Sequence, residues 1–526
     1  MTELKATAKE AFEQFSWHDM WAVFDGNQDR LNITHECIDR HDPEAVAARI
    51  AFANGRIDEP TFGDLSRATA QFAHWLEQRG VQSGQSVGIM MEPSREFYTA
   101  LFGTIKRGAV AVPLYTLFGV DAVRDRVDDS GAVLMVVDEA ARPVVEKLST
   151  EHIVYDSGLA SALAALSEVY VPCTAASDTA VLQYTSGTTR QLAEAVRHEQ
   201  RSVVTLARAG IFATGLKRGD RFFCPSSPAW GHGLWHGTIA PWSLGVAAGS
   251  YSGRFSPERL VDVLRELRIT NLAAASTVYR MILRTGRLAE IRSLEKASYT
   301  GEELGAASQH DFRRQAGVSV CGLYGTTETS VIIVNYPGFP DHEPKPGALG
   351  KPMPGCDVAV LDDRGNPLPP GHPGEISIRR RGGWLRTKDL GSVDAEGFFY
   401  YGGRADDVII SAGWTISPLE VERTLLSHPD VEEAAVVGVP DVTRGLVVKA
   451  FLVTSRSGTS DLTAELQELV KRELSRHEYP RLVEYVEHLP KTVNGKINRR
   501  ALRDSPTTAG VGGDTTPPRQ VHADHL

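Results

Sequence analysis

The chain has 526 residues, of which 42% are hydrophobic and 23% are charged, and its formal net charge is −10 at pH 7. This length exceeds what one hydrophobic core organises, so we expect at least two domains. The acidic balance argues against a nucleic-acid-binding protein or a protein of anionic membrane surfaces. No stretch reaches the roughly 18 to 20 apolar residues that a membrane span needs.

The first residues and the cysteines predict the compartment. Residues 1–6 include an acid and lack an apolar core, so we expect no secretory signal. The five cysteines are widely spaced, odd in number and without a C-x-x-C pair, which favours reduced thiols over disulfides or a zinc site. We therefore expect a cytoplasmic α/β protein of enzyme size.

Apolar strand-like runs alternate with helical patterns along the first four-fifths of the chain. The alternation predicts a mostly parallel sheet covered by helices. The expected elements are strands at 86–91, 109–113 and 132–137 with a helix at 94–107. Later in the chain, a helix at 259–268 is followed by a strand at 269–273.

The remainder of the chain has a different texture. Between residues 346 and 373, short strands broken by Gly and Pro predict a small β subdomain. A second domain is expected beyond Arg404, with a helix from residue 418, a strand at 433–437 and a long helix at 462–476. We predict domains at 1–404 and 405–504, and a disordered tail at 505–526 that is rich in Thr, Pro and Gly.

A run of hydroxyl side chains follows the apolar strand 180–182. The sequence Tyr-Thr-Ser-Gly-Thr-Thr at 184–189 could turn several N–H groups and hydroxyls toward one anion. A polar turn between a strand and a helix is the alternative interpretation of this run alone.

Four further segments can each be interpreted as part of a binding site or as an ordinary turn, cap or linker. Tyr-Gly-Thr-Thr-Glu at 324–328 suits Mg²⁺ and phosphate oxygens, or is a solvated turn. Asp389 could accept hydrogen bonds from ribose hydroxyls, or cap a helix. Residues 402–407 could be a linker, and the basic segment 490–496 a solvated turn.

In their order and spacing, these five segments resemble the adenylate-forming superfamily of acyl-CoA synthetases, firefly luciferases and peptide-synthetase adenylation domains. The resemblance covers roughly residues 45 to 503. It implies a large N-terminal domain of two α/β sheets plus a β-barrel-like part, and a small mobile α+β C-terminal domain. It also implies a ligase that uses ATP and Mg²⁺ to form an acyl-adenylate, from which CoA takes the acyl group.

The resemblance assigns a role to each matching residue. For the nucleotide, it implies a phosphate loop (Thr185, Ser186, Gly187, Thr188, Thr189), a segment beside the adenine (Gly301, Glu302, Glu303), a stacking ring (Tyr324), an α-phosphate contact (Thr327), a Mg²⁺ ligand (Glu328) and two ribose contacts (Asp389, Arg404). For the other steps, it implies an acyl-pocket aromatic (Trp230), a hinge (Asp406), a glycine beside the CoA tunnel (Gly413) and the adenylation lysine (Lys496).

Two segments depart from the family pattern. The phosphate loop usually continues Gly-x-Pro-Lys-Gly-Val, but here Arg190 replaces the first glycine, one residue is inserted, and Ala-Glu-Ala at 193–195 replaces Pro-Lys-Gly. Glu194 thus stands in the place of a lysine, so an attraction to the phosphates is lost and a repulsion is added. The interaction energy of two unit charges ~4 Å apart, at an effective dielectric near 20, is up to roughly 4 kcal/mol. The usual Thr-Gly-Asp is Thr-Lys-Asp, with Lys388 in the place of glycine.

Three functions stay open from the sequence. The protein could join acyl-adenylate to CoA with impaired adenylation, which would require a separate adenylating enzyme. It could be a complete ligase in which Arg190 substitutes for the lysine, consistent with the retained Lys496. It could also be a non-catalytic nucleotide-binding relative. We expect a bulky or cyclic acid of secondary metabolism, in a pocket lined by Trp230, His232, Tyr279 and Tyr299.

Overall fold

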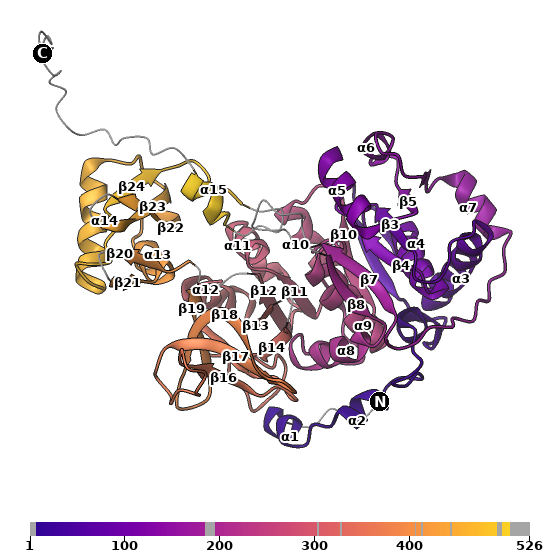
Figure 1. The fold of residues 1–526 in the computed structure, drawn as a ribbon, viewed down its shortest axis with the longest axis horizontal. Helices are drawn as coiled ribbons and strands as arrows, with labels where there is room; N and C mark the ends of the chain where they lie inside the picture. The colour runs from indigo at the N-terminus through magenta and orange to yellow at the C-terminus, as the bar shows by residue number, and fades with distance from the viewer. Residues whose placement is uncertain are drawn as a thin grey trace, which may run out of the picture. The chain divides into compact units, whose positions relative to one another are not determined.

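The fold was analysed in a computed structural model (Figure 1). It describes residues 7–184, 195–301, 304–326, 329–405, 407–411, 414–441, 444–491 and 497–504. The chain divides into two compact units: the first holds residues 1–387 and 391–401, and the second holds 388–390 and everything from 402 onward. The predicted tail at 505–526 lies outside the described residues.

A six-stranded sheet of the first unit begins with the predicted strands. Its order is β6-β5-β3-β4-β7-β8, parallel except for the antiparallel pair β7–β8. Strands buried on both faces read as continuous apolar runs, which is why the sequence reveals β3, β4 and β5. The strands are β3 (Ser86–Met90), β4 (Val110–Pro113), β5 (Leu134–Val137), β6 (His152–Val154), β7 (Thr179–Tyr184) and β8 (Ala195–Glu199).

A second, larger sheet has 13 strands among the described residues. Its order is β16-β17-β18-β19-β15-β14-β13-β12-β11-β9-β10-β1-β2. The strands from β1 through β13 are β1 (Ala48–Phe52), β2 (Ile57–Asp58), β9 (Phe222–Phe223), β10 (Ala248–Ser252), β11 (Asn271–Ala275), β12 (Lys296–Thr300) and β13 (Val320–Thr326). The later strands are β14 (Ser330–Val334), β15 (Ala348–Pro352), β16 (Val358–Leu361), β17 (Gly374–Arg380), β18 (Gly383–Val393) and β19 (Phe399–Arg404).

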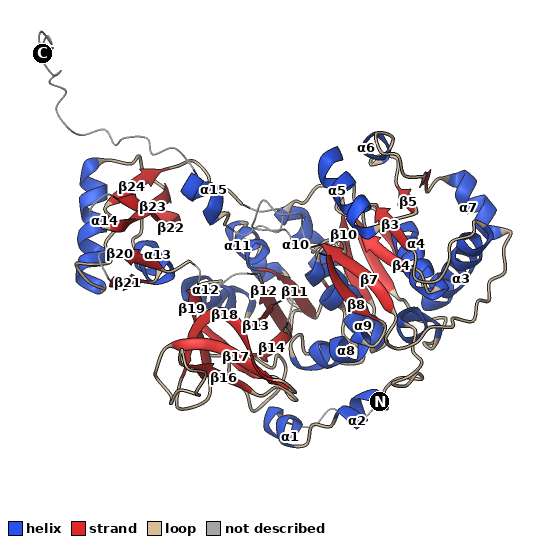
Figure 2. Ribbon diagram, viewed as in Figure 1, coloured by secondary structure: helices blue, strands red, loops and turns tan. Residues whose placement is uncertain are grey.

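The β subdomain predicted near residues 346–373 is part of this larger sheet. The run from β1 through β10, β9, β11 and β12 to β13 is parallel, whereas β13–β14, β14–β15, β15–β19 and β16–β17 pair antiparallel. The strands of the expected β-barrel-like part are therefore hydrogen-bonded to the parallel strands through β13, β14 and β15. The antiparallel end is visible below the centre of Figure 2.

Helices fill the space between the two sheets and cover their outer faces. The shared core joins apolar residues of α3 (Phe62–Gln78), α4 (Arg95–Arg107) and α8 (Ser202–Phe212) with those of β3 and β1. Helix α5 (Val120–Ser130) packs on the other face of the six-stranded sheet, and α10 (Pro257–Glu266), α11 (Ser276–Arg284) and α12 (Ala306–Ala316) cover the larger sheet.

The remaining short helices of the first unit connect these layers. They are α1 (Ala8–Glu13), α2 (Trp17–Trp21), η1 (His35–Asp39), α6 (Arg142–Val145), α7 (Ser157–Ala164), η2 (His232–Ile239), α9 (Ala240–Ser243) and η3 (Leu288–Glu290). No helix in the described part of the chain is both long and apolar enough to cross a membrane.

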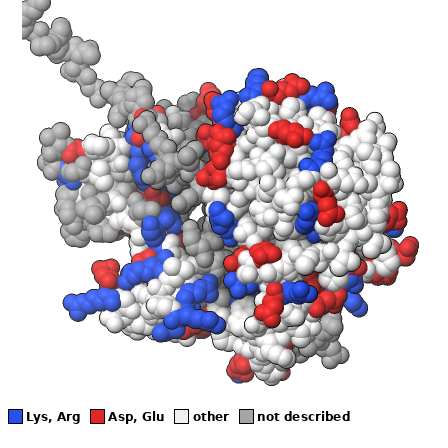
Figure 3. Space-filling view, turned by 45° about the vertical axis from the view of Figure 1, so that its right-hand side comes forward, with Lys and Arg blue, Asp and Glu red and all other residues white. Residues whose placement is uncertain are grey.

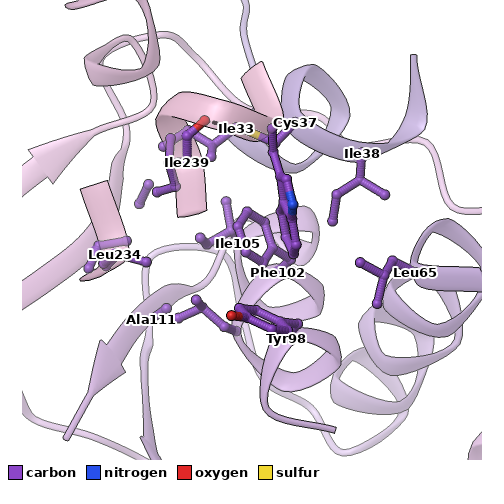
Figure 4. Packing of buried hydrophobic residues seen from close by; sticks show 14 of the residues in the cluster. Ile33, Cys37, Ile38, Leu65, Tyr98, Phe102, Ile105, Ala111, Leu234 and Ile239 are labelled. Carbon is purple, nitrogen blue, oxygen red and sulfur yellow. Dashed lines mark hydrogen bonds between the residues drawn. The ribbon is translucent and has the colours of Figure 1, made fainter. Parts of the chain in front are cut away.

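Helix α4 shows why the sequence forms these elements. Ser94 caps its N-terminus by accepting from the Phe97 N–H at 3.1 Å, and Gly108 ends it in a left-handed conformation (φ 81°). Its buried face contributes Tyr98 and Phe102 to the core that Figure 4 shows in close-up. Removing a buried aromatic of this kind costs about 3–5 kcal/mol, so this layer is a rigid support for the strands beside it.

The second unit is a small α+β fold. Its sheet has the order β21-β20-β23-β22, with β24 paired to β23, and its core unites the sheet with α13 and α14. The elements are β20 (Ile409–Ser411), β21 (Trp414–Ile416), α13 (Pro418–Leu426), β22 (Val431–Asp441), β23 (Gly445–Thr454), α14 (Ser460–Glu473), β24 (Leu482–Tyr485) and α15 (Arg499–Asp504).

Candidate active site

The predicted phosphate loop connects two paired strands. Tyr184, the last residue of β7, lies opposite Ala195, the first residue of β8. The Tyr184 hydroxyl donates to Asp129 Oδ2 at 2.7 Å and lies 3.0 Å from the Arg126 carbonyl oxygen, which fixes the end of β7 to α5. Burial, and then the bond to Asp129, raise the pKa of Tyr184. The loop residues themselves lie outside the described part (Thr185, Ser186, Gly187, Thr188, Thr189, Arg190, Glu194).

A buried network holds both strands of this hairpin from the other side. The indole N–H of Trp235, on η2, donates to Gln183 Oε1 on β7, and the Trp235 ring lies 4.0 Å from the His198 ring on β8. The Gln183 side-chain NH₂ also donates to the Ala229 carbonyl oxygen at 3.3 Å. The ends of the loop are therefore positioned by contacts that do not depend on the loop's own sequence.

The π-helix η2 brings two neutral histidines beside the predicted acyl-pocket residue Trp230. The half-buried Trp230 ring lies 5.5 Å from the His232 ring, which in turn lies 6.0 Å from His236. Burial lowers the pKa of His232 to about 3 and that of His236 to about 4. His232 Nδ1 is 3.1 Å from Ser226 Oγ, whereas His232 Nε2 and His236 Nδ1 are buried without a hydrogen-bond partner among the described residues. Such π-helical segments are frequent at functional sites.

Two tyrosines predicted for the acyl pocket have different surroundings. Tyr299 is buried at the end of β12, and its hydroxyl accepts a hydrogen bond from the Gln309 side chain at 3.1 Å. Tyr279 is fully buried in the core against Phe312, with its hydroxyl 2.9 Å from two carbonyl oxygens. A ring enclosed on all sides has no face for a substrate, so the prediction for Tyr279 is wrong.

The motif at 324–328 begins on the last three residues of β13 and is tied to β18. The Tyr324 hydroxyl donates to Thr387 Oγ1 at 3.2 Å, and the Thr387 hydroxyl donates to the Ile376 carbonyl oxygen at 2.7 Å. A Cβ on Gly325 would lie 1.9 Å from the Ser330 carbonyl oxygen, so only glycine fits at this position. Thr327 and Glu328 lie outside the described residues.

The predicted adenine segment follows β12. Gly301 has a φ of +104°, a conformation that residues with side chains rarely adopt, while the space around it is open. Its neighbours Glu302 and Glu303 lie outside the described residues. Across the described part of the chain, no three His, Cys, Asp or Glu side chains cluster in a way that could hold a metal ion. Because Glu328 lies outside that part, the Mg²⁺ site there stays a prediction.

The two predicted ribose contacts meet in the second unit. Asp389 is 5% exposed, and its Oδ1 accepts a hydrogen bond from Arg404 Nη1 at 3.1 Å. Between Thr387 and Asp389, Lys388 has a left-handed backbone with φ +62°, and its carbonyl oxygen accepts from the Ala405 N–H at 2.8 Å. The predicted hinge Asp406, the tunnel glycine Gly413 and Lys496 lie outside the described residues.

The segment before and after Lys496 is anchored by contacts that the sequence analysis did not find. Lys491 pairs with Ile497 in a β-bridge, and Arg499 Nη2 lies 2.7 Å from Glu422 Oε2 on α13. The Val436 N–H donates to Glu422 Oε1 at 2.8 Å; burial raises the pKa of Glu422 although Arg499 lowers it. The sequence signals the Glu422–Arg499 pair only weakly. Glu422 is an acid among the apolar residues of an amphipathic helix, and a basic segment follows later in the chain.

Charge is mixed on the visible surface. Figure 3 shows acidic and basic side chains interspersed over the face that it draws. The net charge of −10 is therefore not gathered into one acidic area on this face.

Comparison with known sequences and structures identifies the family. Residues 39–384 match the family described as AMP-binding enzyme, and residues 420–496 match its C-terminal domain. The chain belongs to the AMP-binding enzyme family. It is 32% identical to the acetyl-coenzyme A synthetase of Bacillus subtilis over 94% of each chain, and 32% identical to the mitochondrial acyl-coenzyme A synthetase ACSM4 of Homo sapiens over 86% of each.

Solved structures of the AMP-binding enzyme family agree. An acyl-CoA synthetase of Brucella canis matches with a TM-score of 0.76 and 32% identity, covering 95% of this chain and 98% of its own. An anthranilate CoA ligase in complex with anthranoyl-AMP matches with a TM-score of 0.82 and 26% identity, covering 93% and 98%. The predicted membership of the adenylate-forming superfamily is confirmed, as is the mixed α/β fold with a large N-terminal and a small C-terminal domain.

Proposed function

We propose that this acyl-CoA synthetase relative transfers an acyl group from an acyl-adenylate to CoA, and that its activation of free acid by ATP is weak. The observation that carries the proposal is the contrast between two parts of the candidate site. The Tyr324–Thr387 and Asp389–Arg404 contacts keep the residues expected to hold AMP, while Glu194 replaces the lysine of the phosphate loop.

The two half-reactions make different demands. In the first, a carboxylate oxygen attacks the α-phosphorus of ATP, and pyrophosphate leaves with several negative charges, which need cations and N–H donors. In the second, the CoA thiolate attacks the carbonyl carbon of the acyl-adenylate. The bond between that carbon and the phosphate oxygen breaks, AMP leaves with the electron pair, and the thiol proton passes to solvent. No pyrophosphate is involved in this second step.

Each retained residue suits the second half-reaction. Tyr324 would lie against the adenine, and the Asp389 carboxylate and Arg404 guanidinium would bind the ribose hydroxyls. Trp230 would line the pocket for the acyl group, and Gly413 would leave room for the pantetheine arm of CoA. Thr327 would contact the α-phosphate, which is retained in the acyl-adenylate. Of the further roles implied by the family, those of Glu328 and Lys496 belong to the first half-reaction.

At the position of its second glycine, the altered loop acts through charge rather than through the lost glycine. Ala195 takes the place of the loop's second glycine, yet it is an extended strand residue paired with Tyr184, so this position does not need glycine. Glu194 directly precedes it in the sequence and adds a repulsion where an attraction is usual. Even a third of the roughly 4 kcal/mol available at ~4 Å would slow pyrophosphate departure about tenfold.

A complete ATP-dependent ligase is the second candidate. Lys496 occupies the position of the family's adenylation lysine, and the relatives above carry the names of synthetases and ligases. In that case Arg190 would supply the missing positive charge. If adenylation is weak, a separate enzyme would have to supply the acyl-adenylate.

The half-reactions can be measured separately. The protein receives either preformed acyl-adenylate with CoA, or acid, ATP and Mg²⁺ with labelled pyrophosphate, over a panel that includes bulky cyclic acids. We expect acyl-CoA from the first mixture and little pyrophosphate exchange in the second, with Glu194→Lys raising exchange tenfold or more. The charge-neutral Glu194→Gln should raise it less. Strong exchange by the unmodified protein would instead establish the complete ligase.

A further inference from the structure

The π-helix η2 carries two histidines with ring nitrogens that make no hydrogen bond. Nε2 of His232 and Nδ1 of His236 are buried, and neither has a hydrogen-bond partner among the described residues. Nε2 of His41 and Nε2 of His342 are in the same condition, but only in η2 do two such rings lie beside each other in the described part of the chain, 6.0 Å apart. Buried polar groups are nearly always hydrogen-bonded, so this pair requires a physical reason.

The helix holds the two histidines in fixed positions. Leu234 and Ile239 of η2 are fully buried in the shared core, as Figure 4 shows. Ser226 Oγ lies 3.1 Å from His232 Nδ1 and orients that ring from its other side. The two nitrogens without partners are therefore positioned by the fold itself, before any ligand binds.

The row of rings on this segment leads from solvent to the interior. Trp230 and His236 are half-buried, whereas His232 is only 4% exposed. The Trp230 ring lies 5.5 Å from the His232 ring, so the three aromatic side chains are neighbours. A group that enters along Trp230 and His236 comes within reach of the histidine nitrogens at the buried end.

The histidines suit an uncharged polar group. Burial lowers the pKa of His232 to about 3 and that of His236 to about 4, so both rings are neutral at pH 7. A neutral imidazole offers one N–H donor and one bare nitrogen as acceptor, so a hydroxyl can donate to one ring and accept from the other, and a carbonyl oxygen can accept from both. No described Asp, Glu, Lys or Arg shifts either pKa, so an ionised group would be buried here without a countercharge.

We propose that His232 and His236 bind an uncharged oxygen on the acyl group, a hydroxyl or a keto group, and thereby select acids that carry one. The inference rests on the proposed function, because it takes Trp230 as a wall of the acyl pocket. An oxygen about 2.9 Å from each of two nitrogens spans up to roughly 6 Å, which agrees with the 6.0 Å between the rings. A purely hydrocarbon acyl group would leave both nitrogens without partners and would therefore bind more weakly.

The experiment measures the binding of acyl-adenylate mimics in which a sulfamate replaces the reactive phosphate. The acyl group is a cyclohexane or decalin ring that carries a hydroxyl, keto, methyl, ammonium or carboxylate group, at each ring position in turn. We expect the best hydroxyl or keto compound to bind the unmodified protein about tenfold more tightly than its methyl counterpart in calorimetry. The ionised compounds should bind more weakly than the methyl compound.

Variants of the two histidines assign the preference to their nitrogens. His236→Phe keeps an aromatic ring and removes the nitrogens, so the preference for oxygen over methyl should fall below about twofold. His236→Gln keeps a neutral donor and acceptor and should retain part of the preference. His232→Phe should act as His236→Phe does, and if it does not fold, His236→Phe decides alone. His41→Phe is the matched control, because it also removes a buried, neutral histidine without a partner at Nε2, and it should leave the preference unchanged.

The inference and the proposed function can fail separately. Equal binding of the hydroxyl, keto and methyl compounds at every ring position, or a preference that survives His236→Phe, would overturn the inference. Acyl-CoA formed from the matching acyl-adenylates without any preference for oxygen would leave the proposed function standing. Mimics that bind with the expected preference, while the matching acyl-adenylates and CoA give no acyl-CoA, would support the inference and refute thiolation. If no mimic binds, both fail.

Discussion

The two loops expected to handle phosphate are both closed by antiparallel pairs, yet they are anchored by different chemistry. Residues 185–194 lie between the paired Tyr184 and Ala195, and residues 492–496 lie between the bridged Lys491 and Ile497. The first pair is supported on one side by neutral side chains, with Gln183 bound to Trp235 and a histidine against the indole, and Tyr184 itself is tied to Asp129. The second is supported by ion pairs.

The ion pairs around the second loop come from three places in its unit. Arg499 pairs with Glu422, Lys491 with Glu433 at 2.8 Å, and Arg503 with Asp407. The comparison shows that the loop sequence and the loop's anchors are separate features. The first loop departs from its family pattern although a neutral, buried hydrogen bond helps to hold its ends, whereas the second keeps the family lysine and is held by ion pairs.

Loss of the Glu422–Arg499 pair should have the largest effect on stability. Glu422→Ala leaves Arg499 without its carboxylate and the Val436 N–H without an acceptor. Removing one partner of a buried pair costs about 3–5 kcal/mol, and we expect the lower end because the Arg499 side chain is 25% exposed. The measurement is urea unfolding followed by a probe in the second unit.

A matched ion pair of the same unit provides the control. On α14, the exposed Glu468 carboxylate lies 2.6 Å from Nζ of the half-buried Lys471. Glu468→Ala should leave the unfolding midpoint nearly unchanged, because solvent already screens this pair. Equal shifts for the two variants would show that Glu422 is not a special anchor.

Acidic pH should destabilise the fold near the first loop, where three histidines are neutral in the folded protein. Burial lowers the pKa of His198 and His236 to about 4 and that of His232 to about 3. The unfolded chain takes up these protons near pH 6.5, whereas the folded chain does not, so stability is full above pH 7 and falls from about pH 6.5 toward 4. Each histidine contributes up to about 3 kcal/mol of this loss.

The variant His236→Leu tests the origin of that acid sensitivity. It removes one group that must stay neutral, together with a buried Nδ1 that has no hydrogen-bond partner among the described residues. Its melting temperature should therefore fall less steeply with pH than that of the unmodified protein. His18→Leu changes an exposed histidine and should leave the slope unchanged. Parallel slopes for all three proteins would contradict the assignment.

A smaller effect on stability is expected when the hydrogen bond between Gln183 and Trp235 is removed. Gln183→Leu removes the acceptor of the Trp235 indole N–H, which then stays buried without a partner. A buried donor left in this way costs about 1–3 kcal/mol. Both half-reactions should keep their acid and CoA preferences, because the loop sequence is unchanged. A loss of thiolation without a loss of stability would show that Gln183 acts in the chemistry instead.

The sequence predicted the parts of the fold that depend on local pattern. The buried strands β3, β4 and β5 are unbroken apolar runs, and α4 carries its caps in Ser94 and Gly108, so both were found within two residues. The bond between Gln183 and Trp235 joins residues 52 positions apart, and nothing local specifies it. Tyr279 shows the same limit, because an aromatic after a strand reads alike in a pocket and in a core.

The smallest predicted effect concerns the strained position in β18. Lys388→Gly removes a left-handed conformation that costs a side-chain-bearing residue roughly 1–2 kcal/mol. The added freedom of glycine in the unfolded chain offsets about 0.4–1 kcal/mol of that gain. We expect a net stabilisation of about 0.5–1 kcal/mol in urea unfolding, provided that the bond from the Ala405 N–H is kept. Lys388→Ala retains a Cβ and should give no such gain. If both variants raise stability equally, the relief comes from losing the charge beside Arg404 rather than from the backbone.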